Sequence, residues 1–228
     1  MSSRIPLPMP DIVEAVLFDF DMTLVDSSRA VTECLNLLAR DEGLDPITLD
    51  DLMGTIGLPF EESLRRLFGR FDPSWPVKYR ERYRLKEHSM IRPIPGALDA
   101  LRELRSLGLK IGVVSNRNML SLAAERLGVA ELVDLMVGLE AGLPPKPEPH
   151  MLNHTLEELG VSPQRAVYAG DTQADVLCAL KASVAPIGVA TGPLRKEELK
   201  ALGASAALES VAEIPALLRP MVKVAPAL

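Results

Sequence analysis

Apolar and polar positions follow two alternating patterns along the chain. Short apolar runs with little polar alternation are typical of strands that are buried on both faces of a parallel sheet. Such runs lie at Ala15–Phe18, Lys110–Val114, Leu135–Val137, Ala166–Ala169 and Ile187–Ala190. Longer segments, in which apolar residues recur every three or four positions, predict helices at Ala97–Leu107, Met119–Leu127, Met151–Leu159, Ala174–Ala182, Lys196–Leu202 and Val211–Leu218. This alternation predicts an α/β fold, a Rossmann-like parallel sheet flanked by helices.

One interval, from Asp26 to Pro95, contains helical patterns but no convincing buried strand. The predicted helices run from a capping Ser28 to Ala39, from a capping Thr48, over Phe60–Phe68 behind Pro59, and over Val77–Lys86. A stretch of roughly 65 residues is too long for a crossover and fits a small helical domain. We therefore expect a core of residues 1–25 and 95–228, interrupted by an all-helical cap of residues 26–94. A cap that enters just beyond the first strand can act as a movable cover over the ends of the strands.

Composition and charge narrow the class of protein. The 228 residues are 47% hydrophobic and 25% charged, which is typical of a globular protein. The net charge of −6 argues against nucleic acid as a partner, and no apolar run reaches the roughly 20 residues of a membrane span. Cys34 and Cys178 lie in helical patterns, so we expect reduced packing residues in a cytoplasmic protein. Motifs for a CxxC zinc pair, a Walker-type phosphate loop and a GxGxxG dinucleotide turn are absent from the sequence.

The first apolar run ends in two acids, Asp19 and Asp21, followed by Thr23. Carboxylates at the end of a buried strand are costly unless they serve a purpose. If the backbone is still extended there, the two side chains point the same way. Such a pair can bind a divalent cation, and it can also supply a nucleophile and a proton carrier. An acidic turn without chemistry is the alternative interpretation of these residues alone.

Further candidate residues follow the later strands. Ser115 and Asn116 end the second strand and offer a hydroxyl and a backbone amide to phosphate oxygens. Lys146 is flanked by prolines, which restrict the backbone and present its ammonium at a fixed place. Asp171 and Asp175 follow the strand at Ala166–Ala169 and can hold a hard cation if a helix begins there. Each of these features alone is also compatible with a turn, a solvated lysine or an acidic helix start.

Two other clusters of residues are candidate functional sites. His150 and His154 have the spacing of a two-histidine metal site, but no third zinc-type ligand follows, which favours a solvated helix face. The basic stretch from Lys78 to Lys86 is interpreted mainly as a solvent-facing helix surface, with attraction of anionic substrates as the alternative. Arg117, beside the predicted phosphate-binding turn, is the better candidate for substrate contact.

Taken together and in this order, the motifs resemble those of the haloacid dehalogenase superfamily of phosphotransferases. The family motif DxDxT is met by Asp19, Asp21 and Thr23, the second by Ser115, the third by Lys146, and GDxxxD by Asp171 and Asp175. The helical interval resembles the type 1 alpha-helical cap of phosphoglycolate phosphatase-like members. One departure is Met22, where most members have glycine; we expect it to tighten the turn without removing a chemical group.

The resemblance implies a mechanism and a ligand set. It implies that Asp19 attacks phosphorus, that Asp21 serves as general acid and base, and that Ser115, the Asn116 amide and Lys146 hold the phosphate oxygens. It further implies a Mg²⁺ ion bound by Asp19, the Asp21 backbone carbonyl and Asp171, with Asp175 acting directly or through water. Weaker substrate-binding candidates are Thr23, Arg117 and Thr55, the last in the uncharged loop Gly54–Pro59.

The predicted function is that of a Mg²⁺-dependent phosphatase acting on a small phosphate monoester, 2-phosphoglycolate or a similar compound. A beta-phosphoglucomutase-like phosphotransferase shares the cap and all four motifs and is the nearest alternative. A phospho-accepting signalling module without turnover would need neither the cap nor Asp21. The expected partner is a small phosphorylated metabolite, with neither nucleic acid nor a membrane involved, and the expected state is a monomer or homodimer.

Overall fold

The computed structural model describes residues 6–222, so that residues 1–5 and 223–228 of the predicted core lie outside the described part. The chain divides into two compact units. Unit 1 contains residues 6–24 and 93–222 of the described chain, and unit 2 is Val25–Arg92. Among the helices of residues 6–222, none combines the length and the apolar character that crossing a membrane requires.

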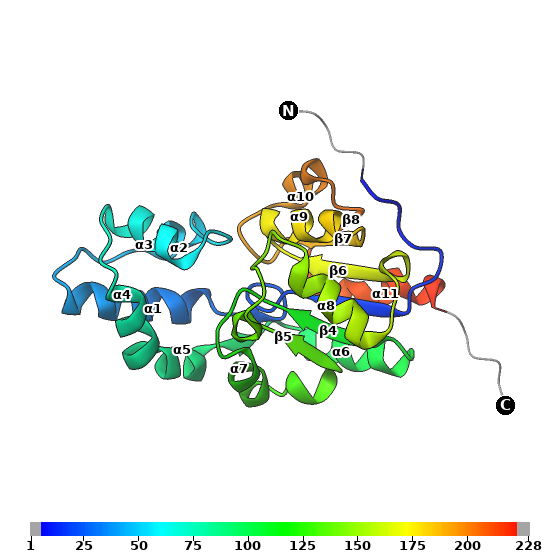
Figure 1. The fold of residues 1–228 in the computed structure, drawn as a ribbon, viewed down its shortest axis with the longest axis horizontal. Helices are drawn as coiled ribbons and strands as arrows, with labels where there is room; N and C mark the ends of the chain where they lie inside the picture. The colour runs from blue at the N-terminus through cyan, green and yellow to red at the C-terminus, as the bar shows by residue number, and fades with distance from the viewer. Residues whose placement is uncertain (1–5, 223–228) are drawn as a thin grey trace. The chain divides into compact units, whose positions relative to one another are not determined.

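Unit 1 is built on a six-stranded parallel sheet with the order β5-β4-β1-β6-β7-β8, which confirms the predicted α/β fold (Figure 1). Its strands are β1 (Ala15–Phe18), β4 (Lys110–Val114), β5 (Leu135–Val137), β6 (Ala166–Gly170), β7 (Ala185–Val189) and β8 (Ala206–Leu208). The central strand β1 is buried along its whole length between β4 and β6. The sequence pattern missed β8, because its three residues are only partly buried and form no apolar run of useful length.

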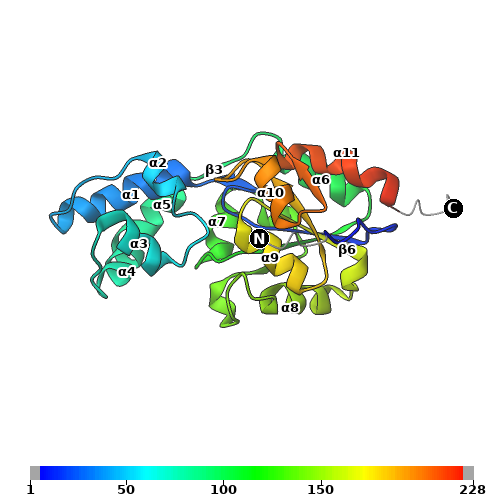
Figure 2. The same ribbon diagram turned by 90° about the horizontal axis from the view of Figure 1, so that it is seen from above.

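Helices cover both faces of this sheet. They are α6 (Ala97–Ser106), α7 (Leu120–Arg126), α8 (His150–Leu159), α9 (Gln173–Lys181), α10 (Lys196–Leu202) and α11 (Ile214–Leu218). The apolar faces of α8 and α9 form one core with Leu17 of β1 and Tyr168 of β6. Helices α6 and α11 lie on the opposite side of the sheet from α8 (Figure 2). Each helix lies within two residues of its predicted range, except that Val211–Glu213 is a short 3-10 turn before α11.

Unit 2 contains helices where they were predicted between residues 26 and 94, but the single helix expected over Val77–Lys86 runs from Trp75 to Met90 with a π-helical turn in its middle. They are α1 (Ser28–Asp41), α2 (Leu49–Met53), α3 (Phe60–Phe68), α4 (Trp75–Lys78), the π-helical turn η1 (Tyr79–Tyr83) and α5 (Arg84–Met90). Their apolar faces share one core, and a short strand pair, β2 (Val25–Asp26) with β3 (Arg92–Pro93), was not predicted. The role of unit 2 as a cap stays a prediction.

The helix starts in unit 2 follow predicted capping with one correction. Thr48 caps α2 as expected, by accepting a hydrogen bond from the Asp51 amide. Ser28 was predicted to cap α1, and this is wrong: Ser28 is the first helical residue, and its amide donates to Asp26 Oδ1 at 3.0 Å. The N-cap residue is Ser27, whose side chain makes no capping bond, and the Asp26 carboxylate accepts the first helical amide instead.

Most cations of the basic stretch in unit 2 have acidic partners. Lys78 lies 2.6 Å from Glu42, and Lys86 lies 2.8 Å from Glu33, so that both neutralise acids of the same unit. Arg84 instead lies mostly buried, 3.4 Å from the fully buried Glu87. The pairings of Lys78 and Lys86 fit the predicted solvent-facing helix surface, whereas the mostly buried Arg84 does not.

Candidate active site

Three neighbouring strands of unit 1 end at the same edge of the sheet and bring the predicted residues together. Asp19 follows β1, Ser115 follows β4 and Asp171 follows β6. The hydrogen bonds between strands extend one residue beyond β1 and β4. The Asp19 amide donates to the Ala169 carbonyl, and the Ser115 amide donates to the Val137 carbonyl. In parallel α/β sheets this edge is the usual place for a ligand.

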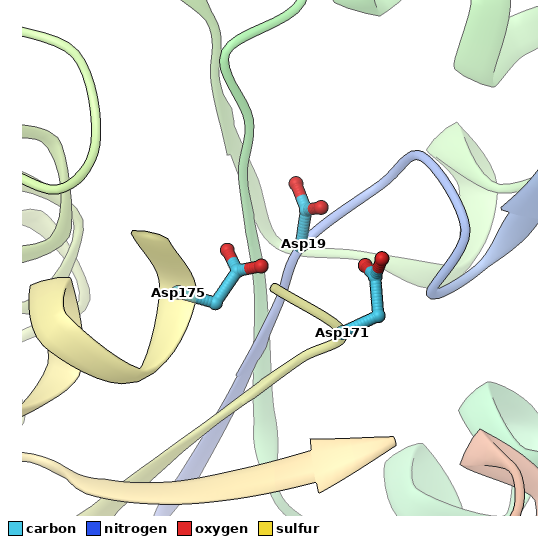
Figure 3. A group of neighbouring side chains, drawn as sticks. All are labelled: Asp19, Asp171 and Asp175. Carbon is cyan, nitrogen blue, oxygen red and sulfur yellow. The ribbon is translucent and has the colours of Figure 1, made fainter. Parts of the chain in front are cut away.

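Three carboxylates, those of Asp19, Asp171 and Asp175, gather at this edge (Figure 3). Each is buried and offers an oxygen, and these oxygens lie within 4.8 Å of one another. Burial, opposed in part by Lys146, raises the pKa of Asp19 to about 7, and the charges of Asp175 and Asp21 add to the rise. Burial and the same crowding of acids raise the pKa of Asp171 well above its ordinary value. The cluster therefore favours the binding of a cation.

Asp171 has one oxygen that is satisfied and one that is not. Its Oδ1 accepts a hydrogen bond from the Thr23 hydroxyl at 2.9 Å. Its Oδ2 is buried and has no hydrogen-bond partner within the described residues. A buried carboxylate oxygen without a partner is expensive, and an oxygen-ligated divalent cation would satisfy it. The donor set thus fits the Mg²⁺ that the motifs imply.

Hydrogen bonds fix both the side chain and the backbone of Lys146. Its Nζ donates to Asp19 Oδ1 at 2.6 Å, to Asp175 Oδ1 at 2.7 Å and to the Tyr168 hydroxyl at 3.0 Å. Its backbone is clamped by the Asn116 side chain, which accepts from the Lys146 amide and donates to the Lys146 carbonyl, both at 2.9 Å. Burial alone would lower the pKa of Lys146, but the carboxylates of Asp175 and Asp19 outweigh it and raise that pKa. The ammonium is therefore a permanent charge beside the Asp19 carboxylate.

Asp175 has little capacity left for direct metal binding. Its Oδ1 contacts Lys146 and Tyr168, and its Oδ2 accepts from the Thr172 amide and hydroxyl in the capping box of α9. The predicted position of Asp175, one turn from Asp171 at the start of a helix, is as expected. Its hydrogen bonds indicate that it orients Lys146.

Asp21 lies apart from Lys146 and pairs with a different cation. The Arg117 guanidinium donates to both carboxylate oxygens, from Nε to Oδ2 at 2.8 Å and from Nη2 to Oδ1 at 2.5 Å. The Arg117 amide lies 3.3 Å from the hydroxyl oxygen of Ser115, which accepts from it. The two acids of the first motif thus have separate partners, Lys146 for Asp19 and Arg117 for Asp21.

The sequence that carries these residues matches a known protein family. Residues 16–189 match the family described as haloacid dehalogenase-like hydrolases. The chain belongs to this family. The range includes Asp19, Ser115, Lys146 and Asp171, which the sheet brings to one edge, and the resemblance predicted from the sequence is confirmed.

Several proteins are similar in sequence or structure to this chain over nearly its whole length. The phosphoglycolate phosphatase of Chromobacterium violaceum is 30% identical over 220 residues, which cover 91% of this chain and 97% of the relative. The "Phosphoglycolate phosphatase, plasmid" of Cupriavidus necator is 30% identical over 223 residues, with 93% and 96% covered. The crystal structure of a HAD family hydrolase from Deinococcus radiodurans, with bound phosphate and sodium, has a TM-score of 0.75 at 25% identity, with 93% and 99% covered. The prediction of an enzyme of the phosphatase type is thereby confirmed.

Some of the predicted site residues make contacts that differ from those expected. Thr23, a substrate-binding candidate, is fully buried and donates to Asp171. Thr55, another candidate, lies in unit 2, where its hydroxyl donates to the Leu52 carbonyl at 2.8 Å. Met22, at the position where the family resemblance implies glycine, has a φ of 58°, the left-handed region in which glycine is favoured.

The sequence reasoning missed Tyr168, Gly192 and the role of the Asn116 side chain at this site. Tyr168 was assigned to a buried strand, and its hydroxyl lies 2.9 Å from the Val114 carbonyl as well as near Lys146. The Asn116 side chain was overlooked in favour of its amide. Gly192 packs so closely on the site that a methyl group there would lie 1.8 Å from Asp171 Oδ2. A tyrosine three residues before the first GDxxxD aspartate was the one available signal, since a buried hydroxyl needs a partner.

Proposed function

We propose that this chain is a Mg²⁺-dependent phosphatase of small phosphate monoesters, 2-phosphoglycolate or a similar compound, that works through an aspartyl phosphate on Asp19. The observation that carries the proposal is the position of the Asp19 carboxylate, buried at the end of the central strand and 2.6 Å from the Lys146 ammonium. The names of the relatives support the substrate class. The free, buried thiols of Cys34 and Cys178 support a cytoplasmic location.

The first chemical step would transfer the phosphoryl group to Asp19. A carboxylate oxygen of Asp19 forms a bond to phosphorus while the bond from phosphorus to the ester oxygen breaks. Asp21 gives its proton to that oxygen as the alcohol leaves. The fixed ammonium of Lys146 and the Ser115 hydroxyl donate to phosphate oxygens whose charge develops in the transition state.

The second step would return the enzyme to its starting state. Asp21, now a carboxylate, takes a proton from a water molecule as the water oxygen attacks phosphorus. The bond from phosphorus to Asp19 breaks, and inorganic phosphate leaves. Asp19 and Asp171, with the Asp21 backbone carbonyl, would hold the Mg²⁺ ion, while Asp175 and Tyr168 keep Lys146 in place. When bound, the cation would neutralise the repulsion between the nucleophile and the phosphate.

Substitution of Asp19 by asparagine tests this proposal. The Asp19→Asn variant is expected to lose hydrolysis of an aryl phosphate and of 2-phosphoglycolate by about 10⁴-fold or more, because the nucleophile is gone. The matched control, Asp99→Asn, replaces an exposed acid of α6 and is expected to keep full activity. Acid quenching of the wild-type enzyme during turnover is expected to trap a phosphate on the peptide that contains Asp19. Activity of the Asn variant near that of the wild type would refute the covalent mechanism.

The cation is tested by its removal. Activity is expected to stop in excess chelator and to return with Mg²⁺, whereas Ca²⁺ is expected to restore it poorly. Ca²⁺ takes more ligands at longer distances and would draw both oxygens of Asp19 into coordination. Full activity in chelator would remove the metal from the proposal. Incubation with a hexose 1-phosphate and a bisphosphate separates the alternative mutase, which would yield a hexose 6-phosphate and little free phosphate.

A further inference from the structure

The side chain of Asn116 joins two loops at the sheet edge and plays no part in the chemistry proposed above. Its Nδ2 donates to the Lys146 carbonyl and its Oδ1 accepts from the Lys146 amide, both at 2.9 Å. One side chain thus pairs with both polar groups of a single backbone residue, as a residue of a neighbouring strand would. Since the two residues are 30 positions apart in the chain, the two bonds fix the loop after β4 against the loop that carries Lys146.

The sequence around Lys146 gives these two bonds their importance. Residues 144–149 include four prolines, which lack a backbone N–H, so that Lys146 and Glu148 have the only amides of this segment. The Glu148 amide is used within the segment, where it donates to the Pro145 carbonyl at 2.9 Å. The Lys146 amide is therefore the backbone donor through which the segment reaches another part of the described chain, and Asn116 accepts it.

The ammonium of Lys146 is held by different contacts, for which a phosphate group would compete. Its three N–H groups face three acceptors, on Asp19, Asp175 and Tyr168. A phosphate oxygen that binds the ammonium takes a share of these hydrogen bonds. The two bonds from Asn116 involve only the Lys146 backbone, so a phosphate on the ammonium does not compete with them.

We propose that Asn116 is a positioning residue, whose side chain fixes the Lys146 backbone while the Lys146 ammonium exchanges partners with the phosphoryl group. This inference rests on the proposed function, in which Lys146 donates to phosphate oxygens. The backbone amide of Asn116, which the family resemblance assigns to the phosphate, belongs to the same residue. The two phosphate donors, one on each loop, are thereby held at a fixed separation, and preorganised donors stabilise the charge that develops in the transition state.

A second asparagine makes the same two bonds in unit 2 and supplies a matched control. The Asn36 Nδ2 donates to the Ile47 carbonyl at 3.0 Å, and its Oδ1 accepts from the Ile47 amide at 2.7 Å. These bonds join α1 to the segment before α2. Ile47 carries no charged group, so loss of this arrangement displaces no phosphate donor. A difference in activity between the two losses therefore reports on Lys146.

Asn116→Ala tests the inference, because it removes the side chain and keeps the backbone amide. Exchange of the Lys146 amide hydrogen, followed by NMR with lysine-selective isotope labelling, is expected to be about tenfold faster than in the wild type. The kcat/KM is expected to fall by about 10- to 100-fold. The factor is expected to be the same for 2-phosphoglycolate and for an aryl phosphate, because the phosphoryl group is common to both.

Asn36→Ala is the control for loss of two hydrogen bonds without loss of positioning. Asn36 is less exposed than Asn116, so its variant is expected to lower the free energy of unfolding in urea at least as much. It is expected to keep the wild-type kcat/KM for the aryl phosphate. An equal loss of kcat/KM in both variants would show a general effect of reduced stability and would overturn the inference.

A chain without the Lys146 ammonium separates positioning from other roles of Asn116. In the Lys146→Met chain, the further change Asn116→Ala is expected to lower kcat/KM by no more than about twofold, because the group that Asn116 positions is gone. Lys146→Arg, which keeps the charge and displaces the donors, replaces Lys146→Met if that chain does not fold. The same loss from Asn116→Ala with and without the ammonium would show that Asn116 does not act through Lys146, and the inference would be wrong.

The remaining outcomes separate this inference from the proposed function. A wild-type kcat/KM in Asn116→Ala, with faster exchange of the Lys146 amide, would overturn the inference and leave the phosphatase standing. Unchanged exchange would show that another group holds this amide, which also contradicts the inference. If the wild type hydrolyses neither 2-phosphoglycolate nor the aryl phosphate, the proposed function itself fails, and the inference fails with it.

Discussion

Gly192 offers a sharp test of how the site is supported, because a single added methyl group meets Asp171, the proposed metal ligand. The Cβ of an alanine at residue 192 would lie 1.8 Å from Asp171 Oδ2, 2.6 Å from Cγ and 2.8 Å from Cβ. Since the whole carboxymethyl group is too close, rotation of the carboxylate alone does not relieve the contact. Asp171 would have to move until these distances exceed 3.0 Å. Its hydrogen bond from Thr23 would be lost or stretched by that movement.

Movement of the loop itself is opposed by a second contact. The neighbouring Thr191 donates from its hydroxyl to the Met22 carbonyl at 2.5 Å, which ties the loop after β7 to the turn that carries Asp19 and Thr23. Overpacking of this kind costs about 1–3 kcal/mol, and the Thr23 hydrogen bond contributes about 1 kcal/mol. We expect Gly192→Ala to lower the free energy of unfolding by about 2–4 kcal/mol. Displacement of a ligand is expected to weaken Mg²⁺ binding about 10- to 100-fold.

Two measurements test this prediction on the same protein samples. Urea unfolding in chelator gives the loss of stability without the cation, and calorimetric titration with Mg²⁺ gives the affinity. Gly54→Ala is the matched control, because its backbone is in the right-handed helical region and the nearest atom to its Cβ is at 3.4 Å, an ordinary contact. An alanine at residue 192 that left both the stability and the Mg²⁺ affinity at wild-type values would refute the fit of this loop against Asp171.

Two further predictions concern the support of Lys146 and the role of unit 2. Tyr168→Phe removes the hydroxyl that contacts Lys146 and Asp175 and retains the Lys146 charge. We expect the free energy of unfolding, measured in urea, to fall by about 1 kcal/mol and kcat to fall about tenfold. An unchanged kcat would show that Asp19 and Asp175 suffice to position Lys146. Ile56→Ala, in the loop of unit 2, is expected to change the ranking of natural phosphate esters in a substrate panel more than the hydrolysis of an aryl phosphate; an equal loss on every substrate would show that this loop supports catalysis and does not select substrates.

The sequence allowed the prediction of those parts of the site that depend on the order of strands and on residue type. Asp19, Ser115 and Asp171 each follow a buried apolar run, and parallel strands place such residues at one edge of the sheet. The clustered carboxylates followed from the same pattern. Strand β1 and helix α10 have the ranges that their apolar patterns predict. Every residue of β1 is buried, and α10 buries Leu199 on one face, so the apolar positions in the sequence reflect the burial in the structure.

Contacts between residues far apart in sequence could not be predicted in this way. The hydrogen bonds of the Asn116 side chain to the Lys146 backbone join two loops, and no periodicity in either loop indicates the other. The same applies to the approach of Gly192 to Asp171. Tyr168 shows a different limit, because an apolar run describes its ring correctly and says nothing about the partner of its hydroxyl.

The charges at the sheet edge make the proposed cation and the substrate depend on each other. When all are ionised, Asp19, Asp171 and Asp175 carry three negative charges against the one positive charge of Lys146. Burial, with a smaller rise from neighbouring acids, raises the pKa of Asp19 to about 7. A phosphate monoester brings further negative charge to the same place, where burial weakens screening by water. A bound divalent cation reduces the electrostatic repulsion between the site and the phosphate. Because such coupling is reciprocal, bound phosphate increases the affinity of the site for the cation.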